Sequence, residues 1–239
     1  FPEEDRTSPR VFLDELRTMV PKDVQLPKDA LDHDVRFGEE IGDNPVVLGY
    51  MFVLENDGID PGMARPFPMC NIRLIPPNSE HVHFDFFQAY RPILNLPVIA
   101  QNARSEGYVN TIPEGTGTVR RVPLLIEYGG IPYPSLAVEV LREGLGVADI
   151  EVHATENGVR NVRLGERVIP TSFRAQMMLN WRGRRGEFAY ISACDVLDGS
   201  VHPQQLKDKF VLVGTSAAGL HDLRMSPLGS RVPGVEIHA

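Results

Sequence analysis

The sequence predicts an α/β domain with a central mixed sheet, helices on both faces and an antiparallel β-meander excursion. Apolar runs at residues 46–53 and 210–213 are typical of buried strands. An amphipathic pattern after Ser135 predicts a helix, and the turn signal Asn157-Gly158 predicts a hairpin between short strands. A chain of 239 residues is long enough to bury a substantial core.

The first predicted element is a helix, with Ser8 as N-cap and Pro9 at the first helical position. Its apolar residues recur at helical spacing: Phe12, Leu13, Leu16, Met19 and Val20. Residues 20–43 are acidic and poorly periodic, so we expect a loop there with a helical piece near residues 34–41.

Three strands are predicted in the next part of the chain. Residues 46–53 are almost wholly apolar, which is expected of a strand buried on both faces. A long connection rich in proline and glycine occupies residues 57–78. Residues 107–110 and 119–128 then form two strands, joined through a turn that contains glycine.

The second half of the chain opens with the helix that begins at Ser135 and stops at Gly146, a plausible C′ residue. One face of this helix carries Leu136, Ala137, Val140 and Leu141. The antiparallel meander follows, with strands at residues 150–154, 159–164 and 166–169.

The last part of the chain is predicted to hold two strands and a short helix. The first of these strands is residues 177–182. Ser192, with Asp195 three residues later, resembles a capping box over a helix at residues 193–197, which Gly199 closes. Residues 210–213 form the final strand.

Composition excludes several classes of protein. Apolar residues make up 42% of the chain and charged residues 23%, as in soluble globular domains. The net charge of -8 argues against nucleic-acid binding, and we interpret the one basic cluster, Arg182, Arg184 and Arg185, as a solvated loop. No apolar run approaches the roughly 20 residues of a membrane-spanning helix.

The chain contains two cysteines, Cys70 and Cys194. Their separation excludes a CxxC redox or zinc pattern. They could form one disulfide in an oxidising compartment, although the default interpretation is two buried free thiols. The chain also begins with Phe1 and has no signal peptide, so we interpret it as an excised or processed fragment.

The loop after the final predicted strand, residues 214–219, can be compared with two enzyme motifs. A nucleophile elbow around Ser216 needs glycine where Ala218 stands, and a P-loop needs lysine where Leu220 stands. A tight turn packed by small side chains is therefore the favoured interpretation. A serine hydrolase using Ser216, with Asp222 and His238 as its other members, stays an alternative.

A second alternative is a metal-binding module that uses His81, His83 and Asp85. If these residues lie on a strand, their side chains share one face and suit zinc or another divalent ion. If they lie on a helix, which the following aromatic residues favour, the three diverge. The favoured prediction is that the protein binds no metal and no cofactor, and this metal site stays a weak alternative.

Arg120 and Arg121 precede a run of apolar residues. Within a strand, one of the two would point inward, and a buried arginine needs a partner. Pairing with an acid such as Asp222 is favoured over contact with a ligand anion. A ligand-binding edge is nevertheless predicted at Arg120, Arg121, Thr215, Ser216 and Asp222.

Several of these segments together resemble the second type of CHASE domain, an extracytoplasmic sensor module of bacterial receptors. The resemblance rests on the sequences at residues 5–9, 107–110, 117–124, 134–137, 206–217, 219–220, 222, 226–229 and 233–239. It spans essentially the whole chain. It implies a single sensor domain over residues 1–239 whose first strand and helix we expect to be missing.

The resemblance also implies a receptor architecture and no catalytic residues. One membrane helix would precede the domain and several would follow it. The sensor domain itself would lie outside the cytoplasm. Beyond them would lie an adenylate or guanylate cyclase, a histidine kinase or a serine/threonine kinase. The stimulus would be an unidentified small molecule or environmental signal, and the parent protein would act as a homodimer.

Overall fold

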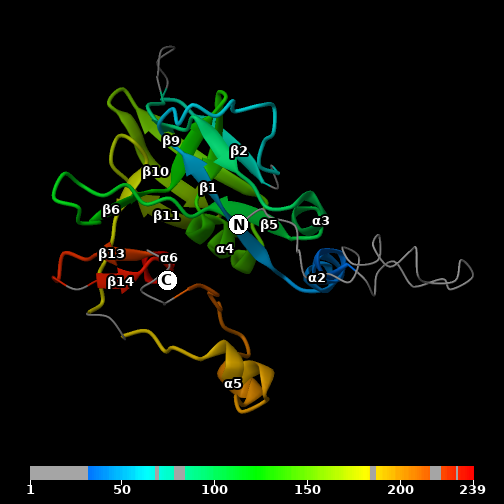
Figure 1. Ribbon diagram of the computed structural model, residues 1–239. Helices are drawn as coiled ribbons and strands as arrows, with labels where there is room; N and C mark the ends of the chain where they lie inside the picture. Colours follow the sequence, from blue (N-terminus) through cyan, green and yellow to red (C-terminus); the bar gives the residue numbers. More distant parts are fainter. Residues whose placement is uncertain (1–31, 68–69, 78–83, 184–186, 216–221, 230) are drawn as a thin grey trace, which may run out of the picture.

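The computed structural model describes residues 32–67, 70–77, 84–183, 187–215, 222–229 and 231–239 (Figure 1). It has the predicted mixed α/β class, and its strands are divided over several sheets. The helix predicted at residues 12–20 lies outside the described residues. Within the described residues, no helix has the length and apolarity needed to cross a bilayer.

Two three-stranded sheets hold the middle of the fold. In the first, β1 (Val47–Val53) pairs antiparallel with β4 (Arg91–Ile93) and parallel with β5 (Ser105–Tyr108). In the second, β7 (Leu125–Tyr128) pairs parallel with β3 (Phe87–Gln88) and antiparallel with β8 (Ile131–Pro134).

The predicted meander is confirmed as part of a four-stranded sheet. Its strands are β9 (Asp149–Thr155), β10 (Gly158–Leu164) and β11 (Arg167–Pro170), and β2 (Asn71–Ile75) pairs parallel with β9. Gly158 has φ +103° in the predicted turn, where an added Cβ would lie 2.7 Å from the Phe173 carbonyl oxygen. Only glycine fits that position without strain.

Two small antiparallel ladders complete the sheets. The strand predicted over residues 119–128 divides at Leu124 into β6 (Arg121–Pro123) and β7, which pair with different strands. β6 pairs with β12 (Gln176–Met178), the shorter form of the predicted strand 177–182. β13 (Leu223–Met225) pairs with β14 (Arg231–Pro233).

The helices follow their capping signals. In α4 (Leu136–Leu145), the Ser135 hydroxyl accepts a hydrogen bond from the Val138 amide, and Gly146 ends the helix at φ +64°. The other helices are α2 (His33–Gly42), α3 (Pro97–Ala100), α5 (Ala193–Leu197), η2 (Pro203–Gln205) and α6 (Val235–His238). The predicted helices at residues 34–41, 136–145 and 193–197 are thereby confirmed.

Two apolar clusters form most of the core. The larger lies between the meander and α4, and it contains Leu125, Val138, Ile150, Val152 and Val162. The second is aromatic and centres on Phe52, whose ring lies 5.2–5.9 Å from four tyrosine rings. Those rings belong to Tyr50, Tyr108, Tyr128 and Tyr133.

β5 approaches the start of α4 so closely that one position admits no side chain. A Cβ added to Gly107 would lie 2.6 Å from the backbone N and Cα of Leu136. We expect Gly107→Ala to lower the free energy of unfolding by roughly 1–3 kcal/mol, because backbone atoms cannot yield as a flexible side chain can. Urea unfolding measures the effect, and Gly115→Ala, where a Cβ meets nothing within 4 Å, is the control. Equal losses in the two variants would contradict the close approach.

Two predictions about apolar runs are wrong. β1 alternates instead of being buried on both faces, since Tyr50 and Phe52 are buried whereas Met51 between them is exposed. Residues 210–213 form no strand, and Val213 is 93% exposed. No hydrogen-bonded ladder with another described strand forms along this run. The Phe210 ring lies against Gly144 of α4 instead of pairing its backbone with a neighbouring strand.

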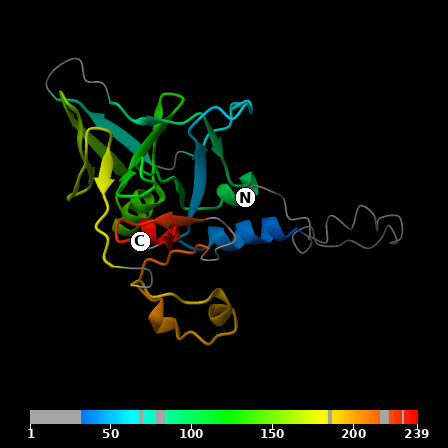
Figure 2. The same ribbon diagram turned by 60° about the vertical axis from the view of Figure 1, so that its left-hand side comes forward.

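The residues around α5 lie apart from the sheets in both views (Figures 1 and 2). Leu197 of α5 is 88% exposed, and the helix has no buried residue. Both cysteines are free, which agrees with the default interpretation. Cys70 is half-buried, but Cys194 at the start of α5 is exposed, so the expectation that both thiols are buried is wrong for Cys194.

Candidate functional site

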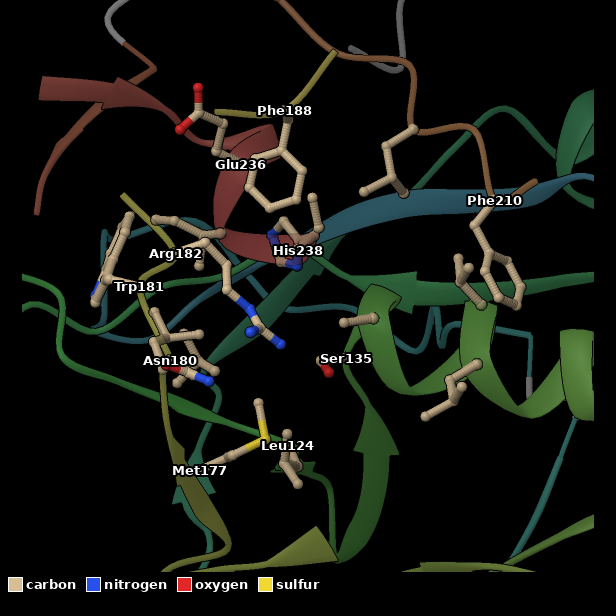
Figure 3. Close-up of a pocket in the computed structure, with 18 of the residues that line it drawn as sticks. Leu124, Ser135, Met177, Asn180, Trp181, Arg182, Phe188, Phe210, Glu236 and His238 are labelled. Atoms are coloured by element: carbon tan, nitrogen blue, oxygen red, sulfur yellow. The ribbon is translucent and has the colours of Figure 1, made fainter. Parts of the chain in front are cut away.

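A groove of about 650 Å³ lies between α4, the segment after β12 and the C-terminal helix α6 (Figure 3). Residues 210–212 form a further wall. Its lining includes Leu124, Ser135, Met177, Asn180, Trp181, Arg182, Phe188, Phe210, Glu236 and His238. Segments far apart in the sequence therefore meet at one site, and β6 with Leu124 adds to its lining.

The walls of the groove are largely apolar. The predicted apolar face of α4 supplies Ala137, Val140 and Leu141, which are only half-buried because they face the groove. Phe188 and Phe210 are also partly exposed there. A concave apolar surface with a few polar groups is the usual form of a small-molecule site.

Arg182 is the principal charged group that points into this space. In Figure 3 its guanidinium lies between Asn180 and Ser135. No ion pair of Arg182 is found among the described residues. The neighbouring Trp181 is fixed by its indole N–H, which donates to the Val119 carbonyl at 3.2 Å. The arginine is thus held next to an aromatic wall with its donors available.

The C-terminal helix contributes two polar side chains. The Tyr190 hydroxyl donates to the Glu236 carboxylate, so this acid is already engaged. Burial lowers the pKa of His238 from its ordinary value of 6.5, against opposing effects of the Val109 backbone and the Asp222 carboxylate. His238 is consequently neutral at pH 7.

We expect His238 to make the protein less stable in mild acid. Its pKa is lower in the folded than in the unfolded state, so its contribution to stability is complete above pH 6.5 and declines as the pH falls from 6.5 through the folded pKa. An NMR titration of the imidazole should give a value below 6.5, and His238→Asn should reduce the loss of stability between pH 7 and pH 5. A folded-state pKa at or above 6.5 would contradict the desolvation of this partly buried imidazole.

The predicted ligand-binding edge is not part of the groove lining wherever it is described. Thr215 is exposed, and Ser216 lies outside the described residues. Asp222 pairs with Arg224 at 3.2 Å. None of the four described members of this edge lines the groove. Their role in binding stays a prediction.

The expectation that one arginine of the pair Arg120 and Arg121 points inward is wrong. Both side chains are about half exposed, at 44% and 45%, and both pair with Glu114, at 2.7 and 3.2 Å. The predicted partner Asp222 is bound to Arg224 instead. The alternation of a strand does not apply to this pair, because β6 begins only at Arg121.

The predicted metal ligands are only partly described. His81 and His83 lie outside the described residues, and the Asp85 carboxylate pairs with Arg174 at 3.4 Å. In the part of the chain that the structure describes, no group of three His, Cys, Asp or Glu side chains could hold a metal ion.

The sequence analysis missed the groove, although one signal for it was present. Arg182 was interpreted as part of a solvated loop with Arg184 and Arg185, which lie outside the described residues. Arg182 is exposed, as expected, but it directly follows the run Met177–Trp181 that supplies the apolar wall. An arginine next to a tryptophan at the end of an apolar run was the available indication.

Comparison with known proteins gives one match. The model of a family described as CHASE2 domain matches residues 4–239. No curated protein and no solved structure matches the chain.

Proposed function

Because the chain belongs to the CHASE2 family, whose members are extracellular sensory domains of receptor proteins, we propose that it is the signal-input domain of a bacterial transmembrane receptor. The output module of that receptor would be an adenylate or guanylate cyclase, a histidine kinase or a serine/threonine kinase. The domain itself would lie outside the plasma membrane, between membrane helices, and the receptor would act as a homodimer.

The observation that supports this proposal is the groove between α4 and α6. A ligand in it would contact the apolar face of α4 and the C-terminal residues Ile237 and His238 together. Membrane helices that follow the domain would receive the signal through α6. A ligand shifts such an equilibrium only by its difference in affinity for the two states, and contacts on both walls provide that difference.

The chemistry of the groove favours an organic anion as the stimulus. Arg182 offers a planar set of donors that matches a carboxylate. Trp181, Phe188 and Phe210 offer aromatic surface for the rest of the molecule. The ligand class that fits is a monocarboxylate with an aromatic or alkyl body.

Calorimetric titration of the purified domain with a panel of aromatic and alkyl monocarboxylates tests this proposal. We expect the best member to bind saturably and Arg182→Ala to weaken it about tenfold, which is the usual effect of losing a partly exposed charged hydrogen bond. Arg167→Ala, on the exposed strand β11, is the matched control and should bind like the original. Binding that is equal in the two variants would overturn the role of Arg182.

A further inference from the structure

Residues 209–214 form a strap along one side of the groove. Phe210 and Leu212 belong to the lining of the groove, whereas Val211 and Val213 are 54% and 93% exposed. The strap belongs to no helix or strand, and its backbone makes no backbone hydrogen bond within the described residues. One face of the strap therefore covers the groove, the other faces solvent, and side-chain contacts hold the segment in place.

The first of these contacts is a seat for Phe210 on α4. Gly144 stands inside this helix, where glycine is less favourable than alanine. A Cβ added to Gly144 would overlap the Phe210 ring, and the three atoms nearest to that Cβ all belong to this ring. In Figure 3 the Phe210 ring points toward α4. The space that Gly144 leaves free is thus occupied by Phe210.

The second contact joins the strap to α6. A Cβ added to Gly214 would lie 2.7 Å from the Cβ and 2.9 Å from the Cγ2 of Val235, the first residue of α6. Ile237 and His238 of the same helix line the groove. The strap consequently touches both α4 and α6.

The strap begins at a residue with an unfavourable backbone conformation. Asp208 has φ +57°, in the left-handed region that side chains with a Cβ disfavour, although aspartate tolerates it better than most residues. The seat of Phe210 is also shallow, since the side chain is 62% exposed and loses little buried area on leaving it. A segment with few buried contacts and no backbone hydrogen bonds opens at low cost in free energy.

We propose that the strap opens and closes the groove, an inference that rests on the groove being the binding site of the proposed function. In the closed state, Phe210 packs on Gly144 and completes one wall. Rotation about the backbone of Asp208 lifts Phe210 and Leu212 away and admits the ligand. A ligand that touches both side chains favours the closed state, because it binds that state more tightly.

Cleavage of the 239-residue chain by a lysine-specific endoproteinase tests the proposal. The chain has four lysines, and two of them, Lys207 and Lys209, are exposed at the start of the strap. To cut the bond between Lys209 and Phe210, the protease must bind the residues on both sides, so Phe210 has to leave its seat. The rate of this cut follows the population of the open strap, and mass spectrometry identifies the fragments.

Gly144→Ala fills the seat at a position outside the lining of the groove. We expect this variant to be cut at Lys209 about fivefold faster, because the Phe210 ring loses its partial burial. If the cut instead required unfolding of the whole domain, the variant would be cut more slowly, since alanine stabilises α4.

Two further variants complete the comparison. Gly214→Ala, which pushes the strap away from Val235, should also be cut faster at Lys209. Gly42→Ala is the matched control, because it adds the same methyl group to the last residue of α2, in ordinary contact with Asn102. This control should be cut at the rate of the original chain.

Three outcomes would overturn the proposal. They are a cut at Lys209 that is no faster in Gly144→Ala than in the original chain, an equal acceleration in Gly42→Ala, and a saturating carboxylate that does not slow the cut in the original chain. If no carboxylate binds, the ligand class proposed for the groove fails, whereas the comparison of the unliganded variants still decides the role of the strap.

Discussion

Replacing Arg142 with alanine should lower the free energy of unfolding by about 3–5 kcal/mol, because the buried Glu139 carboxyl group would lose its ion-pair and hydrogen-bond partner. The Arg142 side chain is 6% exposed and that of Glu139 only 1%. Arg142 also donates to the Val147 carbonyl at 2.7 Å, which satisfies an acceptor just beyond α4. A loss of this size is a large part of the 5–15 kcal/mol that stabilises a typical domain.

Chemical unfolding of three variants separates the charge effect from the packing effect. The double variant Glu139→Leu with Arg142→Met should recover most of the lost stability, since a well-packed apolar pair replaces a buried ion pair at little cost. Arg36→Ala, at an exposed position of α2, should stay within about 0.5 kcal/mol of the original. A double variant as unstable as Arg142→Ala would contradict an electrostatic origin.

Replacing Phe52 with alanine should also lower the free energy of unfolding by about 3–5 kcal/mol, because the change leaves a cavity that its neighbours cannot fill. Phe52 is 2% exposed and sits among four tyrosine rings. The Tyr108 hydroxyl donates to the Pro123 carbonyl at 2.6 Å, so this ring cannot move into the space without breaking a buried hydrogen bond.

The matched control for this variant is Phe37→Ala. Phe37 is 56% exposed on α2, where alanine is a better helix former, so the change should be nearly neutral. Unfolding in urea at one temperature compares the two. If Phe52→Ala costs no more than Phe37→Ala, the aromatic cluster is not the core of this part of the fold.

The elements that the sequence predicts well are those with local signals. α4 is predicted at both ends because Ser135 caps it and Gly146 ends it in the left-handed conformation. The meander is predicted because Asn157 and Gly158 require one particular turn. Such features depend on neighbours within a few residues, and tertiary contacts do not change them.

The features that the sequence does not predict depend on distant partners. The apolar run at residues 210–213 has the composition of a strand, but a strand also needs a neighbouring ladder, and Phe210 packs on α4 instead. Arg120 and Arg121 were also not predicted correctly, although their partner Glu114 is only six and seven residues away, because the pairing depends on how the loop between them folds back. The composition of a segment indicates whether its side chains tend to be buried. Which strand or side chain the segment pairs with depends on the rest of the fold.

The groove could not be predicted for the same reason. Its walls come from α4, the segment after β12, residues 210–212 and α6, and no spacing in the sequence indicates that these converge. The buried pair Glu139 and Arg142 is different, since their i, i+3 spacing on one helix was readable. Their charges stand among the apolar residues of α4, which is the signal that both are buried and paired.

The central claim is that a ligand in the groove joins α4 to the C-terminal helix α6. Hydrogen exchange of the purified domain, with and without the tightest-binding carboxylate of the panel, tests it most directly. We expect slower exchange at α6, where the Ile237 amide bonds to the Gly234 carbonyl, and also in α4, with no change in the meander strand β10. Saturable binding that leaves the exchange of α6 unchanged would contradict the account.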